Sequence, residues 1–203
     1  MLSRTHMAVG VAAAIACVQP ENVTDCAAAV LLGAGGAKLC DVDMLWNKKP
    51  KEVAVALLTA AVMALCLVVL DALTGAGVCL RLLGMLGPLW RLGALLLALQ
   101  CVPGYFAEHR SITHSLLAMT LFTAAVWMIL PTYAAAFAAG YGSHLALDLL
   151  NRKPLRLAFP FKRGWCLRFC KSDGFVNGLL MWLGMAAAIG QLAWPVIQRV
   201  SGL

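Results

Sequence analysis

Uninterrupted apolar stretches alternate with short polar ones along this 203-residue chain. Residues 53–70 are eighteen consecutive uncharged positions, and residues 174–198 form a second run of twenty-five, with Trp182 and Trp194 near its ends. About 20 apolar residues in a helix cross the roughly 30 Å apolar layer of a bilayer, and tryptophans anchor helix ends at the interface. Both runs therefore predict membrane helices.

A third uncharged stretch is divided by a proline. The thirty-seven residues 111–147 contain no Lys, Arg, Asp or Glu, and Pro131 lies within them. Proline lacks the amide hydrogen that a helix interior needs, and therefore ends or kinks a helix. We expect two antiparallel helices, 113–130 and 132–150, joined by a tight turn.

Three other apolar segments are shorter. One is 89–102, which in one interpretation extends backward through the glycine-rich stretch 75–87. Residues 5–18 and 24–37 are rich in Ala and Gly, but each is too short to cross about 30 Å. We expect these two to form a short, partly embedded hairpin with its turn at Gln19–Asp25. A cleaved signal peptide fits less well, because a second apolar segment follows instead of a soluble domain.

The composition agrees with a membrane protein. Hydrophobic residues make up 62% of the chain and charged residues 12%, and the mean hydropathy is +0.85. Disorder is excluded because it needs low hydrophobicity, and eight cysteines without framework spacing exclude an ordinary disulfide scaffold. We predict an all-α fold, a polytopic integral membrane helical bundle with about five to seven hydrophobic segments, the first two short. Residues 1–203 are expected to form a single membrane-embedded domain.

Basic residues gather on one predicted face. If successive helices alternate in direction, residues 1–6, 38–52, 103–112 and 149–173 share a side, and they hold thirteen of the sixteen Lys and Arg residues. Cytoplasmic loops of membrane proteins carry such an excess, so this face is expected to be cytoplasmic. The net charge of +7 then reflects topology and attraction to the anionic headgroups of membrane lipids. Nucleic acid is not expected as a partner.

The four histidines and four of the nine acidic residues fall into four clusters. Each histidine lies beside a polar or acidic neighbour. The clusters are Thr5-His6; Asp41-Val42-Asp43 after a glycine-rich stretch; Glu108-His109-Arg110 followed by Thr113-His114-Ser115; and His144 with Asp148.

The predicted topology brings the clusters together. His6 begins the first short helix and Asp41 and Asp43 follow the second, so an antiparallel hairpin places them side by side. His114 begins the 113–130 helix, whereas His144 and Asp148 lie in the last turns of its partner. Residues four apart share a helix face, so these last two can reach one ion. All four clusters are then expected at the basic face.

The residue types indicate a metal site. We expect His6, Asp41, Asp43, His109, His114, His144 and Asp148 to be its ligands. Imidazoles and carboxylates suit Zn²⁺ first, with Mn²⁺ or Fe²⁺ as alternatives, and the carboxylate share leaves room for one or two ions. Paired metals activate water and clamp phosphoester oxygens. Arg110 is the expected phosphate contact because its fork matches phosphate oxygens. Glu108 is expected to orient a histidine or act as a base.

Each cluster alone has an ordinary structural explanation. A single membrane histidine usually makes a hydrogen bond between helices, and Asp41 and Asp43 precede Lys48 in what could be a solvated loop. However, ionisable residues at membrane depth are costly and mark functional sites, so four clusters on one side favour a metal site. Two alternatives stay open: a transporter of metal ions or protons, and a non-catalytic scaffold with a structural metal.

These motifs resemble the YdjM-type bacterial membrane-bound metal-dependent hydrolases. The family pattern is Thr-His, then Leu-Pro-Asp-x-Asp, His-Arg-x-x-Thr-His-Ser, and His-x-x-x-Asp before Pro-Phe. The matching segments are 5–6, 39–43, 109–115, 144–148 and 160–161, and the third is the most specific. Cys40 replaces the family proline, which is expected to loosen that loop and leave both aspartates in place.

The resemblance implies a metal-dependent hydrolase of the bacterial inner membrane. Together with Arg110 and the basic face, it leads us to expect hydrolysis of a membrane lipid, with a phosphoester as the first choice of bond cleaved and a lipid carboxyl ester as the open alternative. The active site would face the cytoplasm, and the basic aromatic loop 152–171 would gather anionic headgroups.

Overall fold

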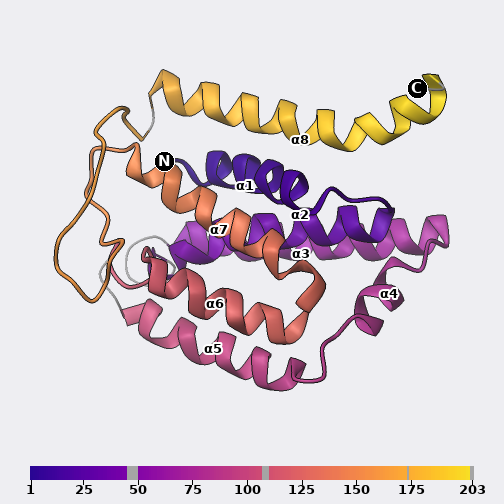
Figure 1. Cartoon of the computed structure of the whole chain (residues 1–203), viewed down its shortest axis with the longest axis horizontal. Coiled ribbons are helices and arrows are strands. Elements are labelled where there is room, and N and C mark those ends of the chain that lie inside the picture. Colours follow the sequence, from indigo (N-terminus) through magenta and orange to yellow (C-terminus); the bar gives the residue numbers. More distant parts are fainter. Residues whose placement is uncertain (45–49, 107–109, 173, 202–203) are drawn as a thin grey trace.

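The computed structural model describes residues 1–44, 50–106, 110–172 and 174–201, and these residues form an all-helical fold (Figure 1). The predicted all-α class is therefore confirmed. Within the described ranges, β pairing is limited to two isolated bridges in the segment after α7, Asn151–Cys170 and Leu155–Trp165. The elements are α1 (Ser3–Val18), α2 (Val23–Leu39), η1 (Cys40–Met44), α3 (Pro50–Thr74), α4 (Val78–Gly84), α5 (Trp90–Phe106), α6 (Leu116–Ile129), η2 (Pro131–Tyr133), α7 (Ala134–Leu149) and α8 (Phe175–Ser201).

Two predicted hairpins are present, and local chemistry determines their ends. Helices α1 and α2 form the first, and Asn22 caps α2 by accepting a hydrogen bond from the Asp25 amide. Helices α6 and α7 form the second, joined through η2, which begins at Pro131. Helix α6 starts at Leu116, two residues after His114, because the Ser115 hydroxyl caps it by accepting from the Ala118 amide at 3.1 Å. The sequence predicted that His114 would begin this helix. In the structure, His114 lies in the turn before it.

The number of membrane spans is smaller than predicted. By length and composition, two described helices could cross a membrane, Val23–Asp43 and Phe175–Trp194. A third span results if Ala61–Thr74 and Val78–Gly84, which meet at 113°, form one broken span. The expected five to seven segments include shorter helices: α6, for example, has 14 residues, which is about 21 Å of helix against roughly 30 Å of apolar bilayer.

Two predicted segments have different limits in the structure. Residues 24–37 were expected to be too short to span, but η1 continues the helical path of α2 to Asp43 and gives a 21-residue segment. The predicted segment stopped at residue 37 because Lys38, the next residue, is charged. Conversely, 75–87 does not extend the next helix. Gly75 and Gly77 have φ values of +62° and +66°, which only glycine adopts readily, and α4 and α5 are separate helices.

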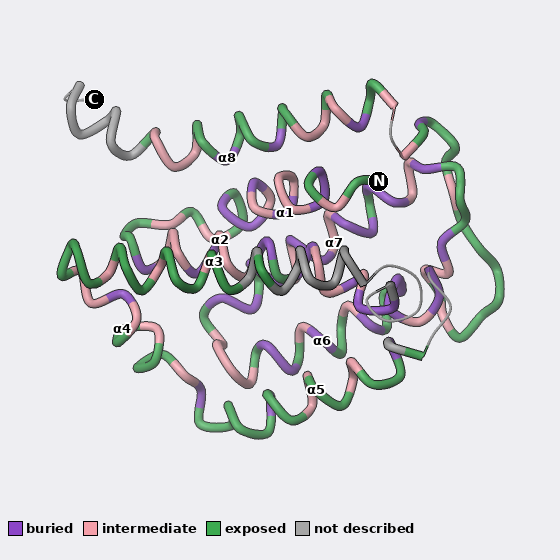
Figure 2. Tube along the Cα trace, turned by 180° about the vertical axis from the view of Figure 1, so that it is seen from behind, coloured by how far each residue is buried: buried purple, intermediate pink, exposed green. Residues whose placement is uncertain are grey.

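Helices α1, α2 and α7 pack closely at glycine residues. A Cβ atom on Gly36 would collide with the carbonyl oxygen of Phe137, and one on Gly140 would collide with the carbonyl oxygen of Gly33. Such contacts between backbones are how small residues drive helix packing in membranes. Figure 2 shows the buried residues concentrated on these three helices, whereas α3, α4 and α5 are largely exposed.

The polar segments gather at one end of this packed unit. The amino terminus, η1, the turn before α6 and the loop between α7 and α8 all lie at the same end of the molecule (Figure 1). Arg4, Lys38, Arg110 and the seven basic residues of the loop 151–172 belong to this end. The opposite end carries the α1–α2 turn and α4. The fold thus has one basic end, as the alternation of helices predicted.

Candidate metal centre

Six of the predicted ligands meet at the basic end, and all are largely buried. They come from α1, η1, the turn before α6, and the last two turns of α7. The residues are His6, Asp41, Asp43, His114, His144 and Asp148. Two other predicted site residues, Glu108 and His109, lie outside the described residues.

Two imidazoles and two carboxylates face one another at the centre of the cluster. The Nε2 atoms of His114 and His144 are 3.3 Å apart. Oδ1 of Asp41 is 3.6 Å from the first and 3.7 Å from the second, and Oδ2 of Asp148 is 3.7 Å and 3.9 Å away. Four tetrahedral donors about 2.1 Å from a zinc ion are about 3.4 Å apart. The distances among Asp41, His114 and His144 are therefore close to what three ligands of one ion require, and Asp148 lies at a similar distance from both imidazoles.

Hydrogen bonds at the opposite ring nitrogens orient these imidazoles. Nδ1 of His144 donates to the carbonyl oxygen of Ala37 at 2.6 Å. The lone pair on Nε2 is therefore available to a metal ion. Nδ1 of His114 lies 3.4 Å from Oδ2 of Asp43. A carboxylate or carbonyl behind the imidazole is the usual arrangement at metal-binding histidines, because it sets the tautomer and raises ligand basicity.

Asp43 differs from Asp41 in its contacts. Its Oδ2 accepts hydrogen bonds from the Thr113 hydroxyl at 3.0 Å and from the Arg110 amide at 3.2 Å. These contacts hold the turn that carries His114. Asp41 belongs to a group that could hold a metal ion, with His114 and His144, whereas Asp43 belongs to neither such group. The sequence treated the two aspartates as equivalent, and the structure places Asp43 behind His114.

His6 contributes to a second group. Its Nε2 is 3.4 Å from Oδ1 of Asp148, and its ring stacks on that of His144 with centroids 3.8 Å apart. Its Nδ1 is buried and has no hydrogen-bond partner among the described residues. The groups His6–His144–Asp148 and Asp41–His114–His144 share His144. Since one imidazole nitrogen binds one ion, the described side chains suit a single ion better than two complete sites.

Cations surround the carboxylates at the edge of the cluster. Nη2 of Arg110 lies 3.0 Å from Oδ2 of Asp148, and Nη1 donates to the Lys153 carbonyl at 2.9 Å. The amino group of Met1 is 2.8 Å from Oδ1 of Asp148, and Nζ of Lys38 is 3.8 Å from Oδ2 of Asp41. Arg110, the predicted phosphate contact, is thus buried and bonded within the protein at both terminal nitrogens.

The electrostatics of His114 also reflect the carboxylates. Burial opposes the charged imidazole, but hydrogen bonds and charges from Asp41 and Asp43 outweigh it and raise the pKa of His114 to about 9. A positive charge is therefore favoured at this position. The buried donor set, two imidazole Nε2 atoms with carboxylate oxygens, fits a divalent transition metal, and these groups could hold one.

Sequence reasoning missed Tyr141, which shapes the cluster, and misjudged Cys40. Tyr141 donates its hydroxyl hydrogen to the Thr113 carbonyl and thereby fixes the turn before His114. Its position three residues before His144, on the same helix face, is the signal that could have indicated it. Cys40, expected to loosen its loop, is fully buried and starts η1, and its Sγ lies 3.9 Å from the Gly36 carbonyl oxygen.

The fold and the cluster define an all-helical membrane protein with a buried His/Asp group that could hold a metal ion. The sequence model of the YdjM inner membrane protein family matches residues 1–200. The chain belongs to this family, which confirms the resemblance seen in its motifs. No curated protein and no solved structure gives a significant match.

Proposed function

We propose that this protein is a metal-dependent hydrolase that cleaves a phosphoester of a membrane lipid at the cytoplasmic face. One observation carries the proposal: at the basic end of a membrane protein, Asp41, His114 and His144 have metal-ligand spacing, and Asp148 lies beside both imidazoles. When bound, a divalent ion supplies activation of water and polarisation of the phosphoryl group.

The side chains of the cluster divide into three roles in this proposal. Asp41, His114, His144 and Asp148 hold the ion, with His6 supporting Asp148. Asp43 and the Ala37 carbonyl orient the imidazoles. Arg110 holds Asp148 in place, and a phosphate that reached the cluster could compete for its guanidinium. Glu108 stays a prediction as the general base, and His109 as a further ligand.

The loop between α7 and α8 supports a lipid as the substrate. It carries seven Lys and Arg residues between positions 152 and 171. Among them Phe161, Trp165 and Phe169 are 72%, 49% and 76% exposed. Basic residues attract anionic headgroups, and exposed aromatic rings settle at headgroup depth. The loop contacts the site directly, since the Arg156 amide donates to the Arg110 carbonyl at 3.3 Å.

The first experiment measures metal and turnover together. Zinc-loaded protein is incubated with mixed bacterial lipids, and products are followed by mass spectrometry. Metal-dependent release of phosphate or a phosphorylated headgroup, lost in Asp148→Ala, supports the proposal. Asp25→Asn is the matched control, because Asp25 lies at the other end of the bundle and accepts from the Tyr133 hydroxyl at 2.6 Å. Release of fatty acid alone would refute phosphoester chemistry and retain the hydrolase.

The orientation is tested separately by cysteine labelling from outside the cell, after the native cysteines are removed. Lys162→Cys lies in the basic loop and Glu21→Cys in the α1–α2 turn, and both positions are exposed. A cytoplasmic site requires labelling at position 21 and none at position 162. Labelling at position 162 alone would place the metal cluster on the periplasmic side.

A structural metal is the second candidate, and the burial of the cluster favours it. His114 and His144 are 0% exposed, and structural zinc sites are closed, whereas catalytic ones keep an open position. However, the Asp41 side chain is 13% exposed and that of its neighbour Lys38 is 27% exposed, so the cluster is accessible from this side. Tightly bound zinc without turnover of any lipid would support the structural role.

A further inference from the structure

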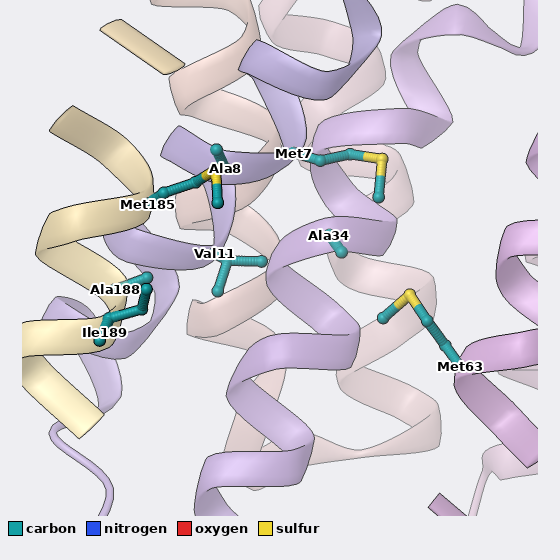
Figure 3. A pocket seen from close by; sticks show the side chains of 8 residues that line it. All are labelled: Met7, Ala8, Val11, Ala34, Met63, Met185, Ala188 and Ile189. Carbon is teal, nitrogen blue, oxygen red and sulfur yellow. The ribbon is translucent and has the colours of Figure 1, made fainter. Parts of the chain in front are cut away.

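A groove with an apolar lining lies beside the metal cluster. Its volume is 270 Å³ (Figure 3). Met7 and Val11 of α1 and Ala34 of α2 line its centre, while Met185 of α8 and Met63 of α3 line opposite sides. Met7 directly follows His6, one of the candidate ligands, so the groove begins next to the cluster.

A polar pair, Ser3 and Lys38, lies one helical turn from the groove on the side of the cluster. Ser3 lies four residues before Met7 on α1, and Lys38 lies four residues after Ala34 on α2, so each shares a helix face with a groove residue. Nζ of Lys38 donates to the Ser3 hydroxyl at 2.8 Å and lies 3.8 Å from Oδ2 of Asp41. The apolar groove, the Lys38 ammonium group and the His/Asp cluster therefore follow one another along α1 and α2.

The groove lies between helices that could span a membrane. Two of its helices, α2 and α8, contain the segments that could span a membrane, Val23–Asp43 and Phe175–Trp194. Ile189 and Met185 on its α8 side are 62% and 39% exposed, and in a membrane such apolar surfaces contact acyl chains. The occupant must then be apolar along most of its length and anionic where it meets Lys38.

We propose that the groove receives an acyl chain of an anionic diacyl phospholipid whose phosphate lies at Lys38 and Ser3, on the Asp41 side of the cluster. This inference rests on the proposed function and names its substrate class. It makes Lys38 the phosphate contact, because Arg110 is already bonded to Asp148 and to the Lys153 carbonyl. When Asp41 is engaged by a metal, the Lys38 ammonium is free for a phosphate oxygen.

Photocrosslinking tests occupancy independently of turnover. Zinc-loaded protein is reconstituted in phosphatidylcholine vesicles containing phosphatidylglycerol with a diazirine on one acyl chain, and crosslinked peptides are identified by mass spectrometry. We expect labelling enriched at Met7, Val11 and Met185 and reduced by unlabelled phosphatidylglycerol. Labelling spread evenly over exposed apolar surfaces such as Leu73 of α3, without competition, would overturn the proposal.

Variants separate the acyl groove from the phosphate contact. Val11→Trp fills the groove and should lower groove crosslinking about tenfold, the effect of losing contact with roughly two methylene groups. It should keep the zinc content. Val69→Trp, at an exposed position on α3, is the size-matched control. Lys38→Gln should remove the preference for phosphatidylglycerol over phosphatidylcholine, and Lys38→Arg should retain it. An unchanged lipid preference in Lys38→Gln contradicts the phosphate assignment.

The outcomes also distinguish this inference from the proposed function. Turnover of phosphatidylglycerol with no crosslinking in the groove would retain the hydrolase and reject the groove. Crosslinking in the groove without any lipid turnover would retain the lipid site and reject the hydrolase. If Val11→Trp slows turnover of the diacyl lipid but not of a short-chain, water-soluble phosphoester, the groove acts on substrate binding as proposed.

Discussion

Helices α1, α2 and α7 and the outer pair α3 and α4 are all apolar in sequence, but they meet their surroundings differently. In the first group, backbones touch at Gly36 and Gly140. In the outer pair, large side chains such as Leu73 and Leu80 are 79% and 77% exposed. Within a bilayer, burying Leu against lipid or protein makes little difference, whereas close backbone contact requires small residues. Apolar sequence therefore indicates that a helix lies in the membrane. Small residues indicate which of these helices pack together around the His/Asp cluster.

The largest effect is expected when a central ligand is removed. His144 belongs to both groups that could hold a metal ion, so His144→Ala should lower zinc affinity by more than about a hundredfold, beyond what loss of an outer partner causes. Metal analysis combined with chelator competition measures this loss. Leu65→Ala on α3 should keep the full zinc content. Equal zinc in both variants would place the metal elsewhere.

A smaller loss of zinc is expected from Asp43→Asn. Asp43 contacts Nδ1 of His114 and holds its turn, and loss of such an outer partner typically lowers metal affinity about 10–100-fold. The same competition assay measures the effect. A loss as large as that of His144→Ala would show that Asp43 binds the ion directly, and no loss would remove it from the site.

The packing contrast is tested with neighbouring glycines. Gly36→Ala should lower the free energy of unfolding by about 1–3 kcal/mol, because the added methyl group meets the Phe137 backbone. At Gly35 an added Cβ meets no atom within 4 Å, so Gly35→Ala should stabilise the helix by up to about 1 kcal/mol. Thermal unfolding in detergent compares the two. Similar shifts of the same sign would contradict the close contact of α2 with α7.

The smallest effect is expected on the outer pair. Leu65 is 62% exposed, and Leu65→Ala should change the free energy of unfolding by less than about 0.5 kcal/mol, as at other exposed positions. The same unfolding assay applies. A loss of more than about 1 kcal/mol, as for buried leucine, would mean that α3 is covered by another molecule in the membrane.

The sequence predicted the helical class, both hairpins and the gathering of the clusters at one end. These features follow from apolar run length, Pro131 and the alternation of helices. The number of spans was not predictable in the same way, because η1 adds length to α2 beyond Lys38 and the Ser115 cap shortens α6. Such boundaries depend on single hydrogen bonds and not on hydropathy.

The site was predictable as a set of residues but not in its division of roles. The separate positions of Asp41 and Asp43 depend on the turn at Thr113, which forms through contacts from distant helices. Likewise, the Arg110 guanidinium is bonded to Asp148 and to the Lys153 carbonyl, which lie far along the chain. Whether these residues bind a metal and act on a lipid stays a prediction.

The distribution of the candidate ligands along the chain has a consequence for biosynthesis. His6 and Asp148, whose side chains are 3.4 Å apart, are separated by 142 residues of the sequence, so His6 is synthesised long before Asp148. A nascent chain that ends with α5 contains His6, Asp41 and Asp43 but lacks His114, His144 and Asp148. Because affinity arises only when ligands are assembled by folding, the ion can be taken up only after α7 has docked against α1 and α2. If the cluster binds an ion as proposed, metal loading is therefore a late step of membrane insertion, and a chain truncated before α6 cannot bind the ion there.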